Sequence, residues 1–402
     1  MTAVAQHAIA IAVPVHNGGR FLDQALGSLR AQTRGDIGIF VLDDASTDGS
    51  FAIVERHAAA DSRIACQRAG ERLGMIEAWR RAARLAFETF QPEYFAWHSD
   101  HDWSSPGWLE TLHATLQANP DVVLAHARTE LVDLEGTRTG TAPPAIDTTG
   151  LSTPDRLARA VFSEMGAGNA VYGLFRRSAL EACGIMRDEI LPDRLLVAEV
   201  NLHGSVAYVE RAERFRRGTF TSLDQNAIVS RQMRNLFRDG YERRRPYTSH
   251  TTCFLRHLAQ PAPECGNVGR DARMLLAMLY YERSLSKFKQ ALVAEFETLG
   301  PEAPDPAVDF VRRGLRRAYA DRDARPAPPS THRDVDVERL TRTVEQLRRE
   351  LKDEQDERSL ALSRAERRYS DLDEGYRLIR CLGAVGRAAL AVRDRWRSAR
   401  TR

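Results

Sequence analysis

The first part of the chain alternates short β-branched runs with amphipathic segments, and this repeat constrains the fold more than any other feature. Residues 9–15 form an apolar run, and the apolar positions of 21–29 then recur at helical spacing. Further strand-like runs lie at 37–42, 64–67 and 94–98, with helical segments between them. Strand–helix units of about 30 residues predict an α/β protein with a parallel, doubly wound sheet and right-handed crossovers.

Polar residues follow three of these predicted strands. Because ligands of parallel sheets bind beyond the carboxyl ends of the strands, we expect a site there. Asp100 and Asp102 lie two residues apart directly after the run at 94–98. Two such carboxylates can reach one hard divalent cation, which takes oxygen ligands and completes its shell with substrate phosphates.

Two other acidic positions allow more than one interpretation. Asp43 and Asp44 end the second strand, where a carboxylate can accept hydrogen bonds from a base or a ribose. Asp44 or Ser46 can equally serve only as a turn or helix cap. Asp193 precedes a helical run that ends near His203, so it is either a helix N-cap or a general base.

Taken together, these segments resemble the family 2 glycosyltransferases. The opening Val13-Pro14-Val15-His16-Asn17-Gly18-Gly19 and the later Val41-Leu42-Asp43-Asp44-Ala45-Ser46 are similar to the first two signatures of that family. Ser99-Asp100-His101-Asp102 matches its DxD position, and Asp193 with the following Leu195-Leu196 looks like the segment that carries the catalytic carboxylate. The resemblance is strong over about 8–135 and weaker to about 220.

The resemblance implies a GT-A fold, with a Rossmann-like mixed sheet, and an inverting transferase that uses a nucleotide-diphospho-sugar. It also implies a role for each matching residue. Asp193 would take the acceptor proton, and Mg²⁺ or Mn²⁺ would be bound by Asp102 and Asp100, the latter contacting ribose or metal. The nucleotide-sugar pocket would be lined by Pro14, His16, Asn17 and one of Asp43 and Asp44. Arg72 is a further candidate for this pocket: it stands near a Gly74 turn that departs from the family pattern, and we expect it to touch phosphate.

Some positions depart from the family pattern or compete for a role. His101, between the two acids of the DxD motif, is expected to form a wall or a phosphate contact rather than a third ligand. Glu199 and Asp188 are rival bases to Asp193. Arg216 and Arg217 resemble a late basic motif and are expected either to grip the diphosphate or to form a solvated strand end.

Composition excludes several other classes of protein. The chain has 58 basic and 55 acidic residues, a net charge of +3, which argues against a nucleic-acid binder. No apolar run approaches the 18 or so residues of a spanning helix. Five cysteines without a CxxC pair indicate reduced thiols rather than a disulfide framework or zinc site. The N-terminus lacks a basic segment and cleavage site, so we expect a cytoplasmic protein, or one at the inner face of the cell membrane.

The chain divides into five predicted parts. We expect a GT-A catalytic domain over 1–222, a helical extension over 223–324 and a Pro-rich linker over 325–333. Heptad spacing predicts a coiled coil over 334–375, and hence a homodimer, with a single solvated helix as the alternative. The basic segment 376–402 has an amphipathic pattern that suits an anionic membrane surface, or packing on a coil partner.

The resulting expectation is a metal-assisted glycosyltransferase of surface polysaccharide or glycoconjugate synthesis, with a glycan or lipid-linked acceptor. The alternative is a catalytically inactive relative that acts as a scaffold through its coil. A nucleotidyltransferase is disfavoured, because no Gly-rich triphosphate loop is present.

Overall fold

The computed structural model describes residues 7–142, 146–162, 167–218 and 246–259, with isolated positions at 236, 276–277, 280, 288 and 291–295. The chain divides into two compact units, one of residues 1–246 with 260–276 and one of 247–259 with 277–402. The predicted linker, coiled coil and basic tail lie outside the described residues and stay predictions.

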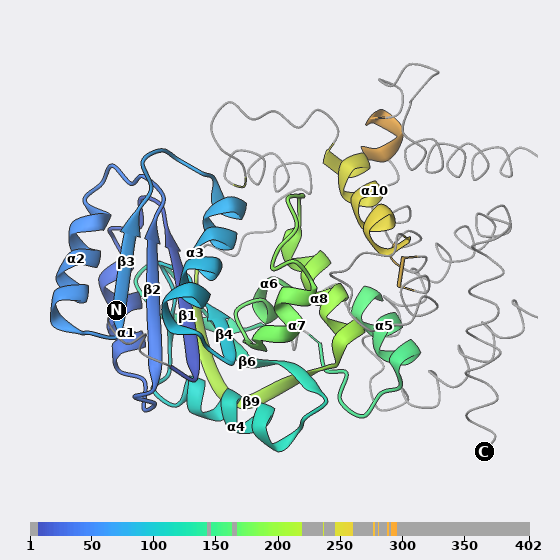
Figure 1. The fold of residues 1–402 in the computed structure, drawn as a ribbon, viewed down its shortest axis with the longest axis horizontal. Coiled ribbons are helices and arrows are strands. Elements are labelled where there is room, and N and C mark those ends of the chain that lie inside the picture. Colours follow the sequence, from blue (N-terminus) through green and yellow to red (C-terminus); the bar gives the residue numbers. More distant parts are fainter. Residues whose placement is uncertain are drawn as a thin grey trace, which may run out of the picture. The chain divides into compact units, whose positions relative to one another are not determined.

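The predicted strand–helix repeat builds the first half of the sheet (Figure 1). Strands β3, β2, β1 and β4 lie side by side in that order and are parallel. The bounds are β1 Ile9–Val15, α1 Leu22–Arg30, β2 Ile37–Asp43, α2 Ser50–Ala60, β3 Ile64–Arg68, α3 Met75–Phe90 and β4 Tyr94–Trp97. The carboxyl ends of β1, β2 and β4 therefore meet at one edge, as the sequence predicted.

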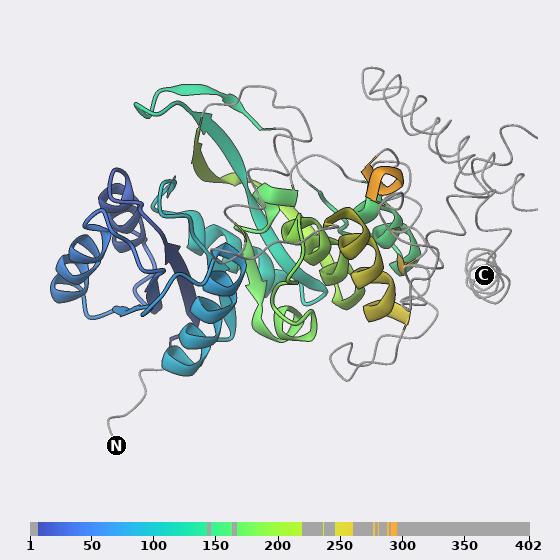
Figure 2. The same ribbon diagram turned by 90° about the horizontal axis from the view of Figure 1, so that it is seen from above.

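The second half of the sheet is mixed: β6 and β9 are parallel, but other pairs are antiparallel, so the expectation of a parallel sheet holds throughout only as far as β4. Strand β8 is antiparallel to both β4 and β6, and β5 is antiparallel to β9. The mixed sheet implied by the family resemblance is confirmed. The bounds are β5 Trp103–Ser104, β6 Val122–Val132, β7 Arg138–Thr141, β8 Leu174–Arg176 and β9 Ser205–Arg217. Strands β6 and β7 (teal) form a hairpin that projects from the sheet in Figure 2.

Helices cover both faces of this sheet. Because strand side chains alternate, Ala10 and Ala12 of β1 face the core that includes α3, whereas Ile9 and Ile11 face the core that includes α1. At Gly38 of β2 the Phe90 ring fills the space that a side chain would need, so a larger residue would not fit there. The remaining helices of this unit are α4 Trp108–Ala118, α5 Thr153–Phe162, α6 Ala167–Ala170, α7 Arg177–Ala182 and α8 Pro192–His203.

In the second unit, helix α10 (Pro246–Ala259) falls in the segment that was expected to be helical. The backbone N–H groups of Tyr247 and Thr248, in its first turn, donate to the carboxylate of Glu295. None of the helices described has the length and apolar character that crossing a membrane requires.

Candidate active site

Two loops at the carboxyl ends of β1 and β2 are tied together. Asn17 has a φ of 53°, a left-handed conformation that Asn tolerates better than most residues. Its backbone N–H donates to Ser46 Oγ at 3.0 Å, and its side-chain oxygen accepts from the Thr47 N–H at 2.8 Å. His16 Nδ1 lies 2.7 Å from the carbonyl oxygen of Asp44. Both predicted pocket residues thus shape the loop pair, with Asn17 exposed.

The structure separates the roles of the two acids that end β2. Both Asp44 carboxylate oxygens accept backbone N–H groups, from Leu73 at 2.5 Å and Gly74 at 3.1 Å. Burial raises the pKa of Asp44, and these two amides, with the nearby His16 and Arg72, oppose that rise. Asp44 therefore holds the loop before α3.

Asp43 is fully buried, and its two carboxylate oxygens differ in their contacts. Its Oδ2 accepts from the Ser46 N–H at 3.1 Å and lies 3.3 Å from Nε of Arg68. Its Oδ1 is buried without a hydrogen-bond partner among the described residues. Such an atom is costly to leave unpaired, so Asp43 is the better candidate of the two for meeting a ligand.

Two further predicted pocket residues flank these loops. Pro14 is half-buried on β1, where it pairs with Leu42 of β2. Arg72 is half-buried close enough to Asp44 for its charge to oppose the rise of that pKa. Their contact with nucleotide or phosphate stays a prediction.

The first acid of the DxD motif lies at the edge of the same site. The Asp100 side chain is 17% exposed, and its Oδ1 accepts from His101 Nδ1 at 2.7 Å. Its Oδ2 lies 2.5 Å from the place that a Cβ on Gly18 would occupy. The glycine of the predicted turn after β1 is therefore needed so that the Asp100 carboxylate can lie there.

We expect Gly18→Ala to push this carboxylate aside and to weaken nucleotide binding. Loss of a contact of about 1.4 kcal/mol lowers an affinity tenfold, so a loss of about tenfold in affinity for UDP, measured by calorimetry, is the expected result. Gly27→Ala is the matched control, because nothing lies within 4 Å of the added methyl on helix α1. Unchanged UDP affinity in Gly18→Ala would argue against Asp100 as part of the site.

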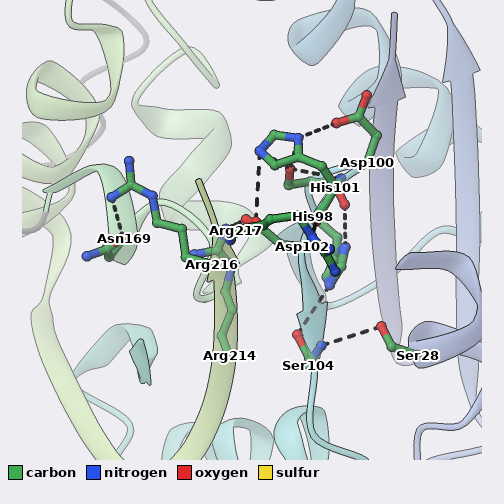
Figure 3. A network of polar contacts seen from close by, with 11 residues as sticks. Ser28, His98, Asp100, His101, Asp102, Ser104, Asn169, Arg214, Arg216 and Arg217 are labelled. Carbon is green, nitrogen blue, oxygen red and sulfur yellow. Dashed lines mark hydrogen bonds and ion pairs between the residues drawn. The ribbon is translucent and has the colours of Figure 1, made fainter. Parts of the chain in front are cut away.

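The second acid, Asp102, is buried and fully engaged (Figure 3). Its side chain is 2% exposed; Oδ2 pairs with the Arg214 guanidinium, and Oδ1 accepts the Arg217 backbone N–H at 2.8 Å. The His101 ring lies between the two acids, with Nε2 3.8 Å from Asp102 Oδ1. Burial acts to lower the pKa of His101, but the Asp100 hydrogen bond and the Asp102 charge outweigh it, so the pKa is raised.

These contacts do not suit a cation held by both acids. Asp102 already neutralises a guanidinium, and an imidazole occupies the space between the two carboxylates. Nor does the described part of the chain contain a group of three His, Cys, Asp or Glu side chains that could hold a metal ion. Of the two predicted ligands, Asp100 alone remains open to a divalent cation.

The arginines at the end of β9 have different roles. Arg217 is buried: Nε donates to the His101 carbonyl at 3.1 Å, Nη1 to the Leu134 carbonyl at 2.8 Å, and Nη2 to Gln24. Its guanidinium also lies over the Phe21 ring, 4.1 Å from the centroid. Arg217 is therefore neither a solvated strand end nor open to a diphosphate.

Arg216 presents the opposite case. It is exposed, and its Nη1 donates to Asn169 Oδ1 at 3.1 Å. Arg214, which the sequence analysis did not single out, is 2% exposed and lies 3.8 Å from the centroid of the Tyr172 ring. Of Arg214, Arg216 and Arg217, it is Arg216 that has the accessibility that binding a diphosphate requires.

Asp193 lies in the first turn of α8, where its negative charge suits the helix dipole. Leu191, with a left-handed φ of 52°, holds the N-cap position, so interpreting Asp193 as the cap was wrong. The Asp193 Oδ2 lies 3.0 Å from the place that a Cβ on Gly168 would occupy. Helix α6 thus contacts Asp193 at Gly168 and Arg216 at Asn169.

The rival bases are less well placed. Glu199 is 3% exposed, and both of its oxygens accept from Arg187, at 2.7 and 3.2 Å. A carboxylate whose two oxygens are both held by one guanidinium is not open to an acceptor hydroxyl. Asp188 is exposed in the loop before α8, outside the first turn in which Asp193 lies.

Comparison with known proteins shows what the first part of the chain is similar to. Residues 10–184 match the family model for glycosyl transferase family 2. EpsH of Bacillus subtilis, whose name places it among glycosyltransferases, is 26% identical over 242 residues. That alignment covers 58% of this chain and 66% of EpsH. An uncharacterized glycosyltransferase of Haemophilus influenzae is 24% identical over 31% of this chain and 37% of its own.

Solved structures agree on the fold. TarS residues 1–349 of S. aureus, in complex with UDP-GlcNAc, align with a TM-score of 0.53 at 12% identity, covering 78% of this chain and 87% of theirs. The same fragment without ligand gives a TM-score of 0.50 at 11% identity, covering 76% of this chain and 79% of its own. The expected GT-A fold is confirmed. Residues 10–184 are therefore similar to glycosyl transferase family 2.

Proposed function

We propose that the chain transfers a sugar from a nucleotide-diphospho-sugar to an acceptor hydroxyl, with inversion at the anomeric carbon. One observation carries the proposal: an unbroken series of contacts joins the base candidate to the nucleotide residues. Asp193 lies against Gly168, Asn169 bonds Arg216, and the neighbouring Arg217 N–H bonds Asp102. The loop between β4 and β5 that carries Asp102 also carries Asp100, whose carboxylate lies against Gly18 in the β1–α1 turn.

Two residues at or near this series have a proposed partner in the donor. Asp43, with its unpaired buried oxygen, would accept an N–H of the base, beside the loop that His16 and Asn17 shape. Arg216 would bind the diphosphate, because an exposed guanidinium forms strong charge-assisted hydrogen bonds with phosphate oxygens. Arg72 is a second candidate for that contact.

The chemistry assigned to Asp193 is that of a general base. In a single displacement, the acceptor oxygen attacks the anomeric carbon as the sugar–phosphate bond breaks, and Asp193 takes the hydroxyl proton. The leaving nucleoside diphosphate gains negative charge, which a fixed cation such as Arg216 stabilises. One displacement inverts the anomeric centre.

We retain Mg²⁺ or Mn²⁺ as a cofactor of this proposal, with Asp100 as the side chain open to it. When bound, such a cation would offset the charge on the leaving phosphate. TarS, which shares the fold, binds UDP-GlcNAc, so we propose a uridine-linked donor as the first to test. The acceptor is proposed to be a glycan or lipid-linked hydroxyl in the synthesis of surface polysaccharide or another glycoconjugate.

A panel of nucleotide sugars, screened by thermal shift with and without Mn²⁺, tests the proposal. Ligand at 100 times its dissociation constant stabilises the native state by about 2.7 kcal/mol, so one donor is expected to raise the melting temperature by several degrees. Asp43→Asn should weaken this shift. No shift with any donor at millimolar concentration would count against the proposal.

Dimerisation through residues 334–375 and membrane contact through 376–402 remain part of the proposal, as does a location at the inner membrane face. Both segments lie outside the described residues, and these roles rest on their sequence patterns alone.

A further inference from the structure

Asp102 and Arg214 form a buried ion pair in the site. Each side chain is 2% exposed, and the carboxylate Oδ2 pairs with the guanidinium. Arg214 lies over the face of Tyr172, 3.8 Å from the ring centroid, which adds a cation–π contact. A buried charge that loses its partner is strongly destabilising, so each of these two groups requires the other.

The pair joins two parts of the chain that lie far apart in sequence. Asp102 stands directly before β5, whose Trp103 and Ser104 pair with Phe215 and Arg214 of β9. The second Asp102 oxygen accepts the Arg217 N–H of the same strand. Asp102 therefore fastens the loop that carries Asp100 and His101 to strand β9.

We infer that Asp102 is a positioning residue, which fixes this loop through Arg214, and that it is not a ligand of the divalent cation. The inference deepens the proposed function and rests on it for the nature of the site. The inference gives the two acids of the DxD motif different roles: Asp102 binds groups of the protein, and Asp100 is the one that meets the donor.

Electrostatics supports this division. A divalent cation on Asp102 would either displace the Arg214 guanidinium, leaving that charge buried without a partner, or lie next to a charge of the same sign. In a buried site either arrangement is costly, because charges are poorly screened there. Within the described part of the chain Asp100 pairs with the His101 imidazole rather than with an arginine, and it is the more exposed of the two acids.

A thermal double-mutant cycle tests the pair without requiring activity. Asp102→Asn and Arg214→Gln are each expected to lower the melting temperature by about 10 °C, and the double variant by clearly less than the sum. Strict additivity would overturn the coupling. Should Asp102→Asn not fold, Arg214→Gln still decides: freeing a cation ligand would strengthen the effect of Mn²⁺ on UDP affinity, whereas losing a positioning pair would not.

The cation itself is tested by calorimetry with UDP, in Mn²⁺ and in EDTA. The ratio of the two dissociation constants is expected to stay within about threefold of the unaltered chain in Asp102→Asn, and to fall toward one in Asp100→Asn. A ratio of one in the unaltered chain would agree as well, since no cation then engages Asp102. Collapse of the ratio in Asp102→Asn, with the ratio retained in Asp100→Asn, would overturn the inference.

Glu199→Gln provides the matched control. It removes another buried carboxylate that is paired with an arginine, Arg187, so it should lower the melting temperature without altering UDP affinity. If UDP does not bind the unaltered chain at all, the uridine-linked donor of the proposed function is ruled out, while the thermal cycle still decides whether Asp102 and Arg214 are coupled.

Discussion

Asp193→Asn is expected to lower the turnover number about 100- to 10,000-fold, the range that a general base contributes. The amide keeps the size and position of the side chain in the first turn of α8 but cannot accept the acceptor proton. Because Asp193 is assigned to the acceptor, the affinity for the nucleotide should change less than twofold. Steady-state kinetics with a donor from the panel, together with UDP calorimetry, gives both quantities.

The rival acids are the controls for this prediction. Asp188→Asn should leave turnover nearly unchanged, and Glu199→Gln should act through stability, because Glu199 is paired with Arg187. Loss of turnover in Asp188→Asn, with activity retained in Asp193→Asn, would move the base to the loop before α8.

Arg216→Ala is expected to weaken UDP binding about 10- to 100-fold, since a hydrogen bond to a charged group contributes roughly 1.5–3 kcal/mol. Uridine, which lacks the diphosphate, should bind the variant and the unaltered chain equally well. This difference between two ligands separates a phosphate contact from a general disturbance of the site. Calorimetry with both ligands measures it directly.

Arg211→Ala is the matched control for Arg216. Arg211 is exposed on the same strand, so its removal changes the net charge equally and should leave UDP affinity unchanged. Equal losses for UDP and uridine in Arg216→Ala would assign the arginine a structural role through Asn169.

The sequence predicted most of the first half of the fold because its signals are local. Each of the strands β1 to β4 is an apolar run, and a polar turn or helix follows it, so the common edge with His16, Asp43 and Asp100 could be anticipated. Strand β8 could not, because Leu174–Arg176 is too short to show a period. Its antiparallel pairing with β4 and β6 makes the sheet mixed.

The division of roles among the site residues depends on contacts between distant parts of the chain. Nothing local distinguishes Asp43 from Asp44; the Leu73 and Gly74 amides do so in the folded structure. Likewise, the sequence around Arg214 predicts a solvated residue on a charged strand. Its burial is explained by the pairing with Asp102, which lies 112 residues away in the sequence. The resemblance to a family located the motifs, and the fold shows which of their atoms remain available.

Hydrolysis of a nucleotide sugar, with water as the acceptor, tests the central claim most directly. Proton NMR follows both the release of the nucleoside diphosphate and the configuration of the free sugar before it mutarotates. We expect an α-linked donor from the panel to release its nucleoside diphosphate and give the β-sugar first, with the reaction suppressed in Asp193→Asn. Appearance of the α-sugar first, or no cleavage of any donor that binds, would contradict the account.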